Sequence, residues 1–326
     1  MTNTPQIAIT GGSGHLGACL IQKLLSRGFS VKAQYLYNAV PITHPKLHWM
    51  EGDINNKEAV TALISDCKVV IHCAGLISIG DKKKSEVYKV NVDGTATVVN
   101  ECIRQGDIRL IHISSSSAVK PGKKNAVYDE KQPYTIKDDF AYPHSKALAE
   151  QLVLQSVKND QLDAIILRPT SMVGPPDYGP SLLGQTILDL SKGALPVITS
   201  GGYDLVDVRD VSETIIKSIE KGQKGEVYLL GGQYITVKEI ARAANNNKIP
   251  IKISIDFLRW ILPLINLYCI FFNMKWPLTK ESLLTLKNAP VHMNSEKATK
   301  AFGHNSRPPS ESIKNLREWF QTTKIN

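Results

Sequence analysis

The stretch Ile7-Ala-Ile-Thr-Gly-Gly-Ser-Gly-His-Leu-Gly17 decides the fold, because it joins a short apolar run directly to three spaced glycines. The apolar run predicts a buried strand. After the glycines, leucines recur on one helical face at positions 16, 20, 24 and 25, and the pattern ends at Arg27-Gly28, a cation followed by glycine. The stretch therefore predicts a strand, a glycine turn and a helix in that order.

The glycines of this turn indicate a binding site for a dinucleotide. Gly11 or Gly12 permits a tight turn. Gly14 leaves room for a pyrophosphate beside the main chain, and Gly17 lets the helix pack close to the strand. The N–H groups of the first helical turn lack partners within the helix and carry the positive end of its dipole. An anion is expected there, and a dinucleotide pyrophosphate fits.

The second strand, expected at residues 31–38, leaves the choice of dinucleotide open. An acidic residue about 20 residues past the turn would bind the adenosine ribose of NAD, and an arginine there would accept the 2′-phosphate of NADP. This strand ends in Leu36-Tyr37-Asn38 and offers neither. We expect NAD or NADP, with NAD slightly favoured.

Composition places the chain among soluble globular proteins. It has 326 residues, of which 42% are hydrophobic and 21% charged, which excludes disordered and collagen-like chains. The first strand begins too early for a secretory signal, and the five scattered cysteines form no CxxC pair, so a cytoplasmic protein with reduced thiols is expected. The eight histidines include no HExxH motif, and no metal site is predicted.

The formal net charge of +9 comes partly from lysine clusters at residues 82–84 and at positions 120, 123 and 124. Such runs are solvated loops in most proteins, but these two follow strand ends that face a ligand crevice in this architecture. An anionic substrate group or a cofactor phosphate is therefore the alternative. The chain has no helix-turn-helix, finger or aromatic-interleaved basic stretch, so no nucleic-acid partner is predicted.

Strands alternate with helices through the first half of the chain. Strands are expected at residues 47–54, 68–75, 110–117 and 162–169, and helices at residues 57–64 and 86–104. This order predicts an α/β protein with a doubly wound parallel Rossmann sheet and helices on both faces. We expect residues 1–172 and about 204–232 to form a dinucleotide-binding domain. Residues 173–203 and 233–326 would form a smaller, mostly helical substrate domain.

One apolar run in the second region, residues 257–272, has three interpretations. It spans 16 residues and contains Arg259, Pro263 and Asn266, so it is too short and too interrupted for a transmembrane helix. A buried helix is one interpretation. The others are an apolar wall for the substrate and a surface that lies on a membrane or a partner.

Three polar features stand out in the Rossmann region. Asn91 falls on the inward face of the helix predicted at residues 86–104, where its amide needs partners. A serine cluster, residues 114–117, follows a strand at the edge where α/β proteins bind ligands. Tyr142 and Lys146 lie one helical turn apart on one face. His72, within the strand at residues 68–75, is interpreted as a hydrogen-bonded core histidine.

Together these segments resemble the extended short-chain dehydrogenase/reductase family, also described as NAD-dependent epimerases/dehydratases. The matching segments are Thr10-Gly-Gly-Ser-Gly-His-Leu-Gly17, Gly52-Asp53, Cys73-Ala-Gly75, Asn91-Val-Asp-Gly-Thr95, the serines before Ala118-Val119, Tyr142-x-x-x-Lys146 and Leu167-Arg-Pro169. The segments Pro277-Leu-Thr279 and Glu318-Trp-Phe320 look more like the branch of 3β-hydroxysteroid dehydrogenases and dihydroflavonol reductases. The resemblance covers about two thirds of the chain.

The resemblance implies a mechanism. Tyr142 would exchange a proton with a substrate hydroxyl or carbonyl, while Lys146 lowers the pKa of the phenol and holds the nicotinamide ribose. A serine would donate to the developing oxyanion; the family pattern selects Ser116, with Ser115 and Ser117 as fallbacks. Asn91 would support a proton-relay water. The implied cofactor contacts are Gly11, Gly14, His15, Leu16, Gly17, Asp53, Ile54, Ala74, Gly75, Lys146 and Pro169.

The sequence thus predicts an NAD(P)-dependent oxidoreductase that acts on an alcohol or carbonyl of a hydrophobic, sterol- or flavonoid-like small molecule. One alternative is a nucleotide-sugar epimerase or dehydratase with tightly bound NAD. The other is a non-catalytic dinucleotide-binding redox sensor, which would not need an acid–base pair. The family resemblance further implies a homodimer, and the run at residues 257–272 allows for peripheral membrane contact.

Overall fold

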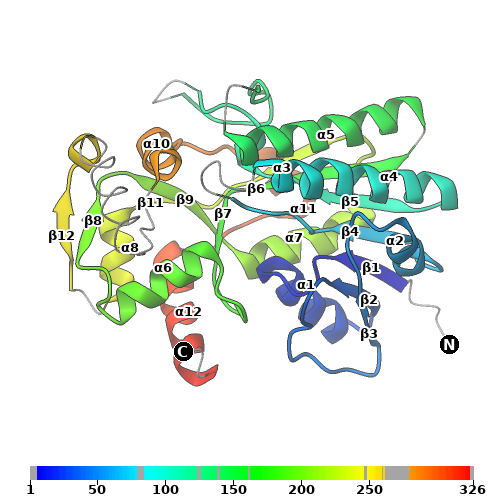
Figure 1. Ribbon diagram of the computed structural model, residues 1–326, viewed down its shortest axis with the longest axis horizontal. Coiled ribbons are helices and arrows are strands. Elements are labelled where there is room, and N and C mark those ends of the chain that lie inside the picture. Colours follow the sequence, from blue (N-terminus) through cyan, green and yellow to red (C-terminus); the bar gives the residue numbers. More distant parts are fainter. Residues whose placement is uncertain are drawn as a thin grey trace.

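A parallel seven-stranded sheet forms the centre of the protein in the computed structural model (Figure 1). The structure describes residues 6–78, 84–122, 126–137, 140–160, 162–245, 248–258, 260 and 279–323. In spatial order the strands are β10 (Val227–Leu230), β6 (Asp163–Pro169), β5 (Arg109–Ile113), β4 (Val69–His72), β1 (Gln6–Thr10), β2 (Ser30–Tyr35) and β3 (Leu47–Glu51). The strand order reverses between β1 and β4, where doubly wound sheets bind their ligands. The predicted fold is confirmed.

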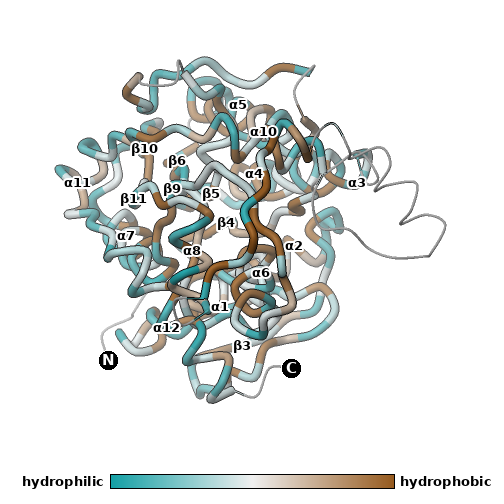
Figure 2. The backbone as a smooth tube through the Cα atoms, turned by 90° about the vertical axis from the view of Figure 1, so that its left-hand side faces the viewer, coloured by the Kyte–Doolittle hydropathy of each residue, from teal (hydrophilic) through white to brown (hydrophobic). Residues whose placement is uncertain are grey.

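Helices cover both faces of this sheet, as Figure 1 shows. One face packs against α1 (His15–Ser26), α7 (Val208–Lys221) and α11 (Glu296–Phe302). The other packs against α2 (Lys57–Ile64), α4 (Gly94–Gln105) and α5 (Ala141–Asn159). Successive residues of β4 enter opposite cores, so its unbroken apolar sequence is explained by burial on both sides. In Figure 2 hydrophobic stretches of the chain run through the middle of the molecule.

The single helix predicted at residues 86–104 is interrupted around Asn91. The chain forms α3 (Lys84–Tyr88), a wider π-helical turn η2 (Lys89–Asp93) and then α4. In this turn the Gly94 N–H reaches back five residues to the Lys89 carbonyl, and the Thr95 hydroxyl donates to the Asn91 carbonyl at 2.6 Å. Such wide turns are frequent at functional sites. Here the turn adds one residue to the helix face that contacts α5.

The rest of the chain forms smaller layers beside the main sheet. Its strands are β7 (Ser171–Val173), β9 (Gly202–Asp207) and β11 (Gln233–Thr236) in one sheet and β8 (Val197–Thr199) and β12 (Ile251–Ile253) in another. Its helices are α6 (Leu182–Ser191), α8 (Val237–Ala244), α10 (Lys280–Asn288) and α12 (Pro309–Thr323).

Residues 204–232, which we expect to belong to the dinucleotide-binding domain, divide between two sheets. Strand β9 pairs with β7 and β11 in the small sheet, whereas β10 is a strand of the main sheet and α7 packs on that sheet. A helix from the C-terminal region, α11, also packs on the main sheet through Ala298 and Phe302. The two-domain boundaries stay a prediction.

Most of the apolar run at residues 257–272 lies outside the described residues. Of its described members, Leu258 is buried against Leu283 and Leu286 of α10, while Phe257 and Trp260 are exposed. In the part of the chain that the structure describes, no helix is long and apolar enough to cross a membrane.

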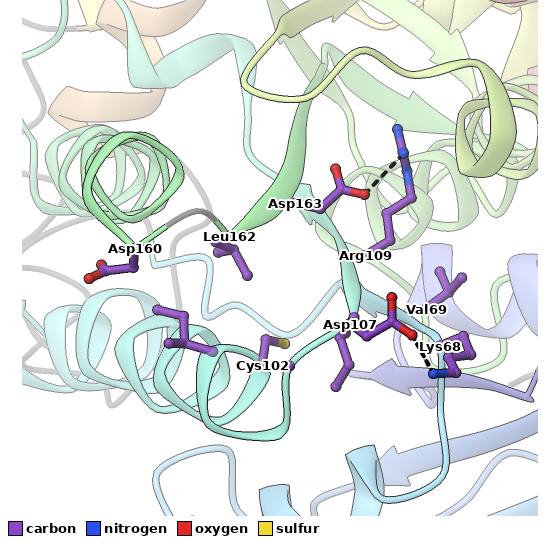
Figure 3. A pocket seen from close by; sticks show the side chains of 11 residues that line it. Lys68, Val69, Cys102, Asp107, Arg109, Asp160, Leu162 and Asp163 are labelled. Atoms are coloured by element: carbon purple, nitrogen blue, oxygen red, sulfur yellow. Dashed lines mark hydrogen bonds and ion pairs between the residues drawn. The ribbon is translucent and has the colours of Figure 1, made fainter.

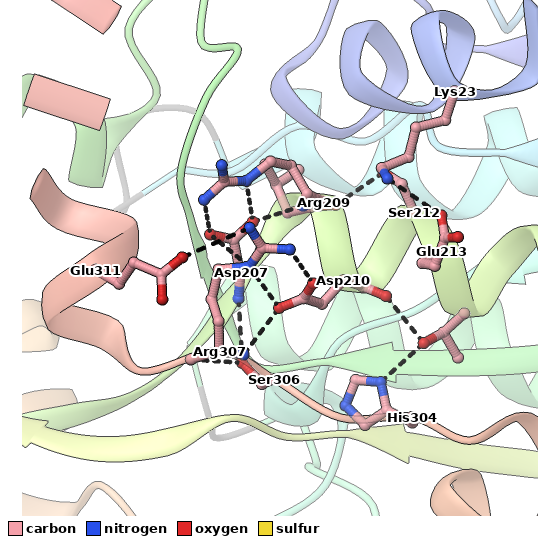
Figure 4. A network of polar contacts seen from close by, with 12 residues as sticks. Lys23, Asp207, Arg209, Asp210, Ser212, Glu213, His304, Ser306, Arg307 and Glu311 are labelled. Carbon is pink, nitrogen blue, oxygen red and sulfur yellow. Dashed lines mark hydrogen bonds and ion pairs between the residues drawn. The ribbon is translucent and has the colours of Figure 1, made fainter. Parts of the chain in front are cut away.

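A partly buried ionic cluster joins β9 and α7 to the C-terminal helix (Figure 4). Asp207 caps α7 and accepts two hydrogen bonds from the Arg209 guanidinium, at 2.9 and 2.7 Å. Arg307, just before α12, pairs with Asp210 at 2.5 Å. Burial opposes the charged form of Asp207, but the hydrogen bonds and positive charge of Arg209 outweigh it and lower its pKa. The cluster holds α12 against α7, and α7 is bonded in turn to the last turn of α1, where Lys23 donates to Glu213 at 3.1 Å.

Candidate active site

The glycine turn forms a cradle that β-carbons would fill. Gly11 has φ +67°, and a β-carbon there would lie 2.8 Å from the Ala74 backbone. A β-carbon at Gly17 would lie 2.2 Å from the Gly11 carbonyl oxygen. Helix α1 begins directly afterwards, with Gly14 as its N-cap, no capping side chain and no acidic residue in its first turn. Its first amides are thus available to an anion, and these residues fit a dinucleotide pyrophosphate.

His15, the first residue of α1, contacts the chain where it leaves β7. Its Nε2 lies 2.7 Å from the Gly174 carbonyl oxygen, to which it donates as the Nε2–H tautomer. Gly174 has φ +112°, and a β-carbon there would lie 2.7 Å from an Asp207 carboxylate oxygen. His15, which is predicted to contact the cofactor, is therefore packed between the glycine turn and the ionic cluster of Figure 4. Leu16, next to it, is buried in the core and has only its backbone amide to offer.

The residues predicted to meet the adenosine lie beyond β2 and β3. Asp53 is exposed, and its carboxylate accepts hydrogen bonds from the backbone and side-chain amides of Asn55. Ile54 is buried, and a β-carbon at Gly94 would come within 2.7 Å of it. After β2, Tyr37 is 81% exposed. Asp53 thus remains accessible to a ligand beside the end of β2.

Three predicted site residues meet where β4 ends. A β-carbon at Gly75 would lie 3.4 Å from Asn91 Oδ1 and 3.9 Å from Lys146 Nζ. Ala74 connects this point to the glycine turn, since its N–H donates to Thr10 Oγ1 at 3.1 Å. The predicted contacts at Ala74 and Gly75 therefore lie between the pyrophosphate turn and the predicted catalytic lysine. Pro169, the last residue of β6, is buried two strands away from β4.

Lys146 is buried at the carboxyl end of β5. Its Nζ donates to the Ile113 carbonyl at 2.7 Å, and the residue is only 5% exposed. Burial lowers its pKa from 10.5 to about 8, although the nearby Glu150 carboxylate acts in the opposite direction. The ammonium therefore gives up its proton more readily than a surface lysine does.

Tyr142 lies one turn before Lys146, in the first turn of α5. Pro143 follows it, where a missing N–H costs nothing. Burial raises the pKa of the Tyr142 phenol, and a hydrogen bond with the Ser115 side chain lowers it. The phenol and a serine hydroxyl thus converge at the end of β5.

The serine whose side chain lowers the pKa of Tyr142 is Ser115, whereas the family pattern preferred Ser116; which of them acts on the substrate stays a prediction. Ser115 caps the short 3-10 helix η3 (Ser116–Ala118). The backbone carbonyl of Ser116 accepts a hydrogen bond from the Tyr128 hydroxyl. Ser114, the first serine of the cluster, is buried and donates to Glu150 at 2.7 Å. The four serines at the end of β5 have different neighbours. A sequence motif alone does not show which serine contacts which residue.

Asn91 finds the partners that its inward position requires. Its Oδ1 accepts from the Leu76 N–H at 2.7 Å, and its Nδ2 donates to the Leu76 carbonyl and to Ser145 Oγ at 3.1 and 2.9 Å. Ser145 in turn donates to the Tyr142 carbonyl at 2.8 Å. Asn91 therefore ties the segment after β4 to the first turn of α5.

His72 is a hydrogen-bonded core residue. Thr95 Oγ1 donates to the Asn91 carbonyl, so it accepts from His72 Nε2–H, at 2.9 Å, and His72 Nδ1 then accepts from Thr10 at 2.7 Å. Burial lowers its pKa to about 3, so the ring is neutral. This chain of bonds links the glycine turn to the wide turn at Asn91.

Glu150 and Arg168 form a buried ion pair that the sequence analysis missed. Two Arg168 nitrogens, Nε and Nη2, donate to Glu150, and Tyr134 donates to its Oε1 at 2.8 Å. The two side chains are 0% and 3% exposed. Glu150 follows Lys146 by four residues, on the helix face that already holds Tyr142. This four-residue spacing is the sequence signal that could have identified Glu150.

A separate hollow lies at the opposite end of the same strands (Figure 3). It is lined by residues at the start of β4, β5 and β6. Four of the charged residues that line it form two ion pairs, Lys68 with Asp107 at 2.6 Å and Arg109 with Asp163 at 3.2 Å. None of the predicted site residues lines it.

The chain matches known proteins over most of its length. The model of the NAD dependent epimerase/dehydratase family matches residues 7–231. Sterol demethylase protein B of Methylococcus capsulatus is 32% identical over 235 residues, 71% of each chain. A 3 beta-hydroxysteroid dehydrogenase/Delta 5→4-isomerase of Mycobacterium tuberculosis is 30% identical over 203 residues, 60% of this chain and 54% of that one. The crystal structure of gox2253 has a TM-score of 0.84 at 26% identity, covering 98% of this chain and 99% of that one.

Proposed function

The chain belongs to the NAD dependent epimerase/dehydratase family, the extended short-chain dehydrogenases/reductases, and we propose that it transfers a hydride between nicotinamide and an alcohol or carbonyl of an apolar substrate. The observation that supports this proposal is the Lys146 ammonium buried against the Ile113 carbonyl at the carboxyl end of β5, with Tyr142 one turn before it on α5 and Ser115 beside the phenol. A protein that only senses the dinucleotide has no need of these groups.

Each residue has one task in the proposed reaction. When bound, the nicotinamide supplies or accepts the hydride. In the reductive direction Tyr142 donates its proton to the carbonyl oxygen as that oxygen gains charge, and Ser115 donates a hydrogen bond to the same atom. Lys146, in its charged form, favours the phenolate that remains. Asn91 holds the segment after β4 and, through Ser145, the turn that carries Tyr142.

Exposed hydrophobic side chains in the segments that follow β4 and β5 support an apolar substrate. Ile77 follows β4, and Val127 and Ile136 lie in the crossover from β5 to α5; all three are more than half exposed. Large apolar side chains at the ligand edge of an α/β sheet favour a hydrophobic ligand over a nucleotide sugar. The names of the relatives, a sterol demethylase protein and a hydroxysteroid dehydrogenase, agree with a sterol-like molecule.

We propose NAD in preference to NADP. The segment that follows β2 presents Leu36 and Tyr37, which are 46% and 81% exposed. Neither can pair with a 2′-phosphate, whose recognition in this fold uses an arginine. The hydroxyl-bearing ribose of NAD needs no such cation.

Two measurements test the proposal together. The protein is denatured without added cofactor, and released dinucleotide is identified by mass spectrometry. Turnover is then measured with NAD and a 3β-hydroxysteroid, and with NADH and a 3-oxosteroid. We expect an exchangeable site and turnover of the steroid. Stoichiometric NAD on release, with no steroid turnover, would favour an epimerase or dehydratase and contradict the proposal.

A further inference from the structure

Ser115 can donate a hydrogen bond to the substrate oxygen only if its single hydroxyl hydrogen points toward the substrate. A serine hydroxyl has one hydrogen and two acceptor positions. In the reductive direction the substrate oxygen accepts from Ser115, so the hydrogen has to face the substrate. Any other acceptor within reach of Ser115 competes for it.

The third serine of the cluster lies within that reach. Ser117 Oγ is 2.8 Å from Ser115 Oγ, and either atom can be the donor. The Ser117 N–H also donates to Ser115 Oγ, at 3.1 Å. If Ser115 donated to Ser117, its hydrogen would be lost to the reaction. If Ser117 donates instead, both acceptor positions of Ser115 are filled and its hydrogen is free for Tyr142 or the substrate.

We propose that Ser117 is a positioning residue whose hydroxyl and N–H together turn Ser115 into a hydrogen-bond donor aimed at the substrate oxygen. This inference rests on the proposed function. A hydroxyl that accepts two hydrogen bonds is polarised and donates more strongly, so Ser117 also strengthens the bond that it directs.

The local backbone holds the two serines in this relation. Ser115 is extended, with φ −154° and ψ 149°, and its carbonyl accepts from the Ala118 N–H at 3.0 Å. Ala118 is fully buried, and its carbonyl accepts from the Thr135 N–H and hydroxyl at 3.0 and 3.1 Å. Ser117 lies between these fixed points, so loss of its hydroxyl leaves the η3 backbone bonds in place.

The experiment is a double-mutant cycle with Ser117→Ala, Ser115→Ala and the double variant, and with Ser117→Thr to restore the hydroxyl. Turnover is measured with NADH and a 3-oxosteroid. The titration of the Tyr142 phenol, followed by ultraviolet difference absorbance against Tyr142→Phe, gives a readout that needs no substrate. The Ser115 hydroxyl is the group that lowers the pKa of that phenol, and Lys146 lies one turn further along α5.

We expect Ser117→Ala to lower kcat about three- to tenfold with KM unchanged, the loss of one hydrogen bond, and to raise the pKa of Tyr142. Ser117→Thr should restore both. In the Ser115→Ala background, Ser117→Ala should change neither, because its effect passes through Ser115.

Two results would overturn the inference. Equal losses from Ser117→Ala in both backgrounds would make Ser117 a structural residue of η3, and an unchanged Tyr142 titration in Ser117→Ala would remove its hydroxyl from the site. Full turnover in Tyr142→Phe and Ser115→Ala would instead remove the proposed function itself.

Discussion

The two ends of the central sheet differ in the exposure of their charged side chains. At the amino ends of β4 and β5, Lys68 and Asp107 form an exposed ion pair beside the hollow of Figure 3. At the carboxyl end of β5, Lys146 is buried and bonds a backbone carbonyl. The exposed pair is solvated and stabilises little, whereas the buried ammonium has a pKa lowered by its surroundings. A surface hollow is thus a weaker indicator of a catalytic site than a buried side chain with a shifted pKa.

The largest effect is expected from Tyr142→Phe, which removes the proposed acid at the carboxyl end. We expect kcat to fall by about two to four orders of magnitude, the usual contribution of general acid–base catalysis. NADH affinity, measured by calorimetry, should change by less than about twofold because the phenol is not needed to hold the dinucleotide. A Tyr142→Phe enzyme with normal kcat would place the chemistry elsewhere.

A second test compares two glycines with the same backbone angle at the two ends of the sheet. Gly11 and Gly106 both have φ +67°, but a β-carbon at Gly11 would meet the Ala74 backbone at 2.8 Å, while one at Gly106 would meet nothing within 4 Å. We expect Gly11→Ala to weaken NADH binding at least about tenfold, because strain and a clash distort the pyrophosphate turn.

Gly106→Ala is the matched control. It has the same positive φ without the clash, and it lies beside the hollow of Figure 3. We expect a lower melting temperature and unchanged NADH affinity. Equal losses of affinity in both variants would show that strain alone, and not the cradle at Gly11, governs binding.

The third prediction concerns pH. The folded pKa of Lys146, about 8, lies below its ordinary value of 10.5, so between these values the unfolded chain binds more protons than the folded one. Stability should therefore rise with pH across this window. We expect the free energy of unfolding of the wild type to gain up to about 3 kcal/mol relative to Lys146→Met between pH 8 and 10.5. Parallel curves for the two proteins in urea titrations would contradict the burial of a titrating ammonium.

The smallest effect is expected from Lys68→Met at the amino end. Its ion pair with Asp107 is exposed, with side chains 64% and 88% accessible, and such pairs contribute little. The melting temperature should shift by less than about 2 °C, and kcat should stay at the wild-type value. A large loss of activity would show that the two ends of the sheet are coupled.

Much of the fold could be predicted because apolar periodicity and glycine spacing are local signals. The strand and helix around Gly11 and the position of α5 follow from residues that are neighbours in the sequence. The wide turn at Asn91 could not be predicted, since it depends on the Thr95 hydroxyl taking the Asn91 carbonyl. The pairing of β9 with β7 and β11 likewise depends on partners far along the chain.

The same limit applies to the site. The spacing of Tyr142 and Lys146 marks a helix face, and both do lie near the end of β5. Four adjacent serines have no spacing that distinguishes one from another, so the family pattern selects Ser116, whereas Ser115 is the serine that lowers the pKa of the phenol. Glu150 was missed because it lies in α5 while its partner Arg168 lies in β6, so the pair forms only when the two elements pack together. Local spacing identifies a face, and only the fold decides which neighbour that face meets.

The most direct test of hydride transfer follows a label. NADH carrying deuterium at the transferable position of the nicotinamide is incubated with the wild type or Tyr142→Phe and a 3-oxosteroid, and the alcohol is analysed by mass spectrometry. We predict one deuterium in the alcohol formed by the wild type and no alcohol above background with Tyr142→Phe. Unlabelled alcohol, or equal labelled product from both proteins, would contradict hydride transfer assisted by Tyr142.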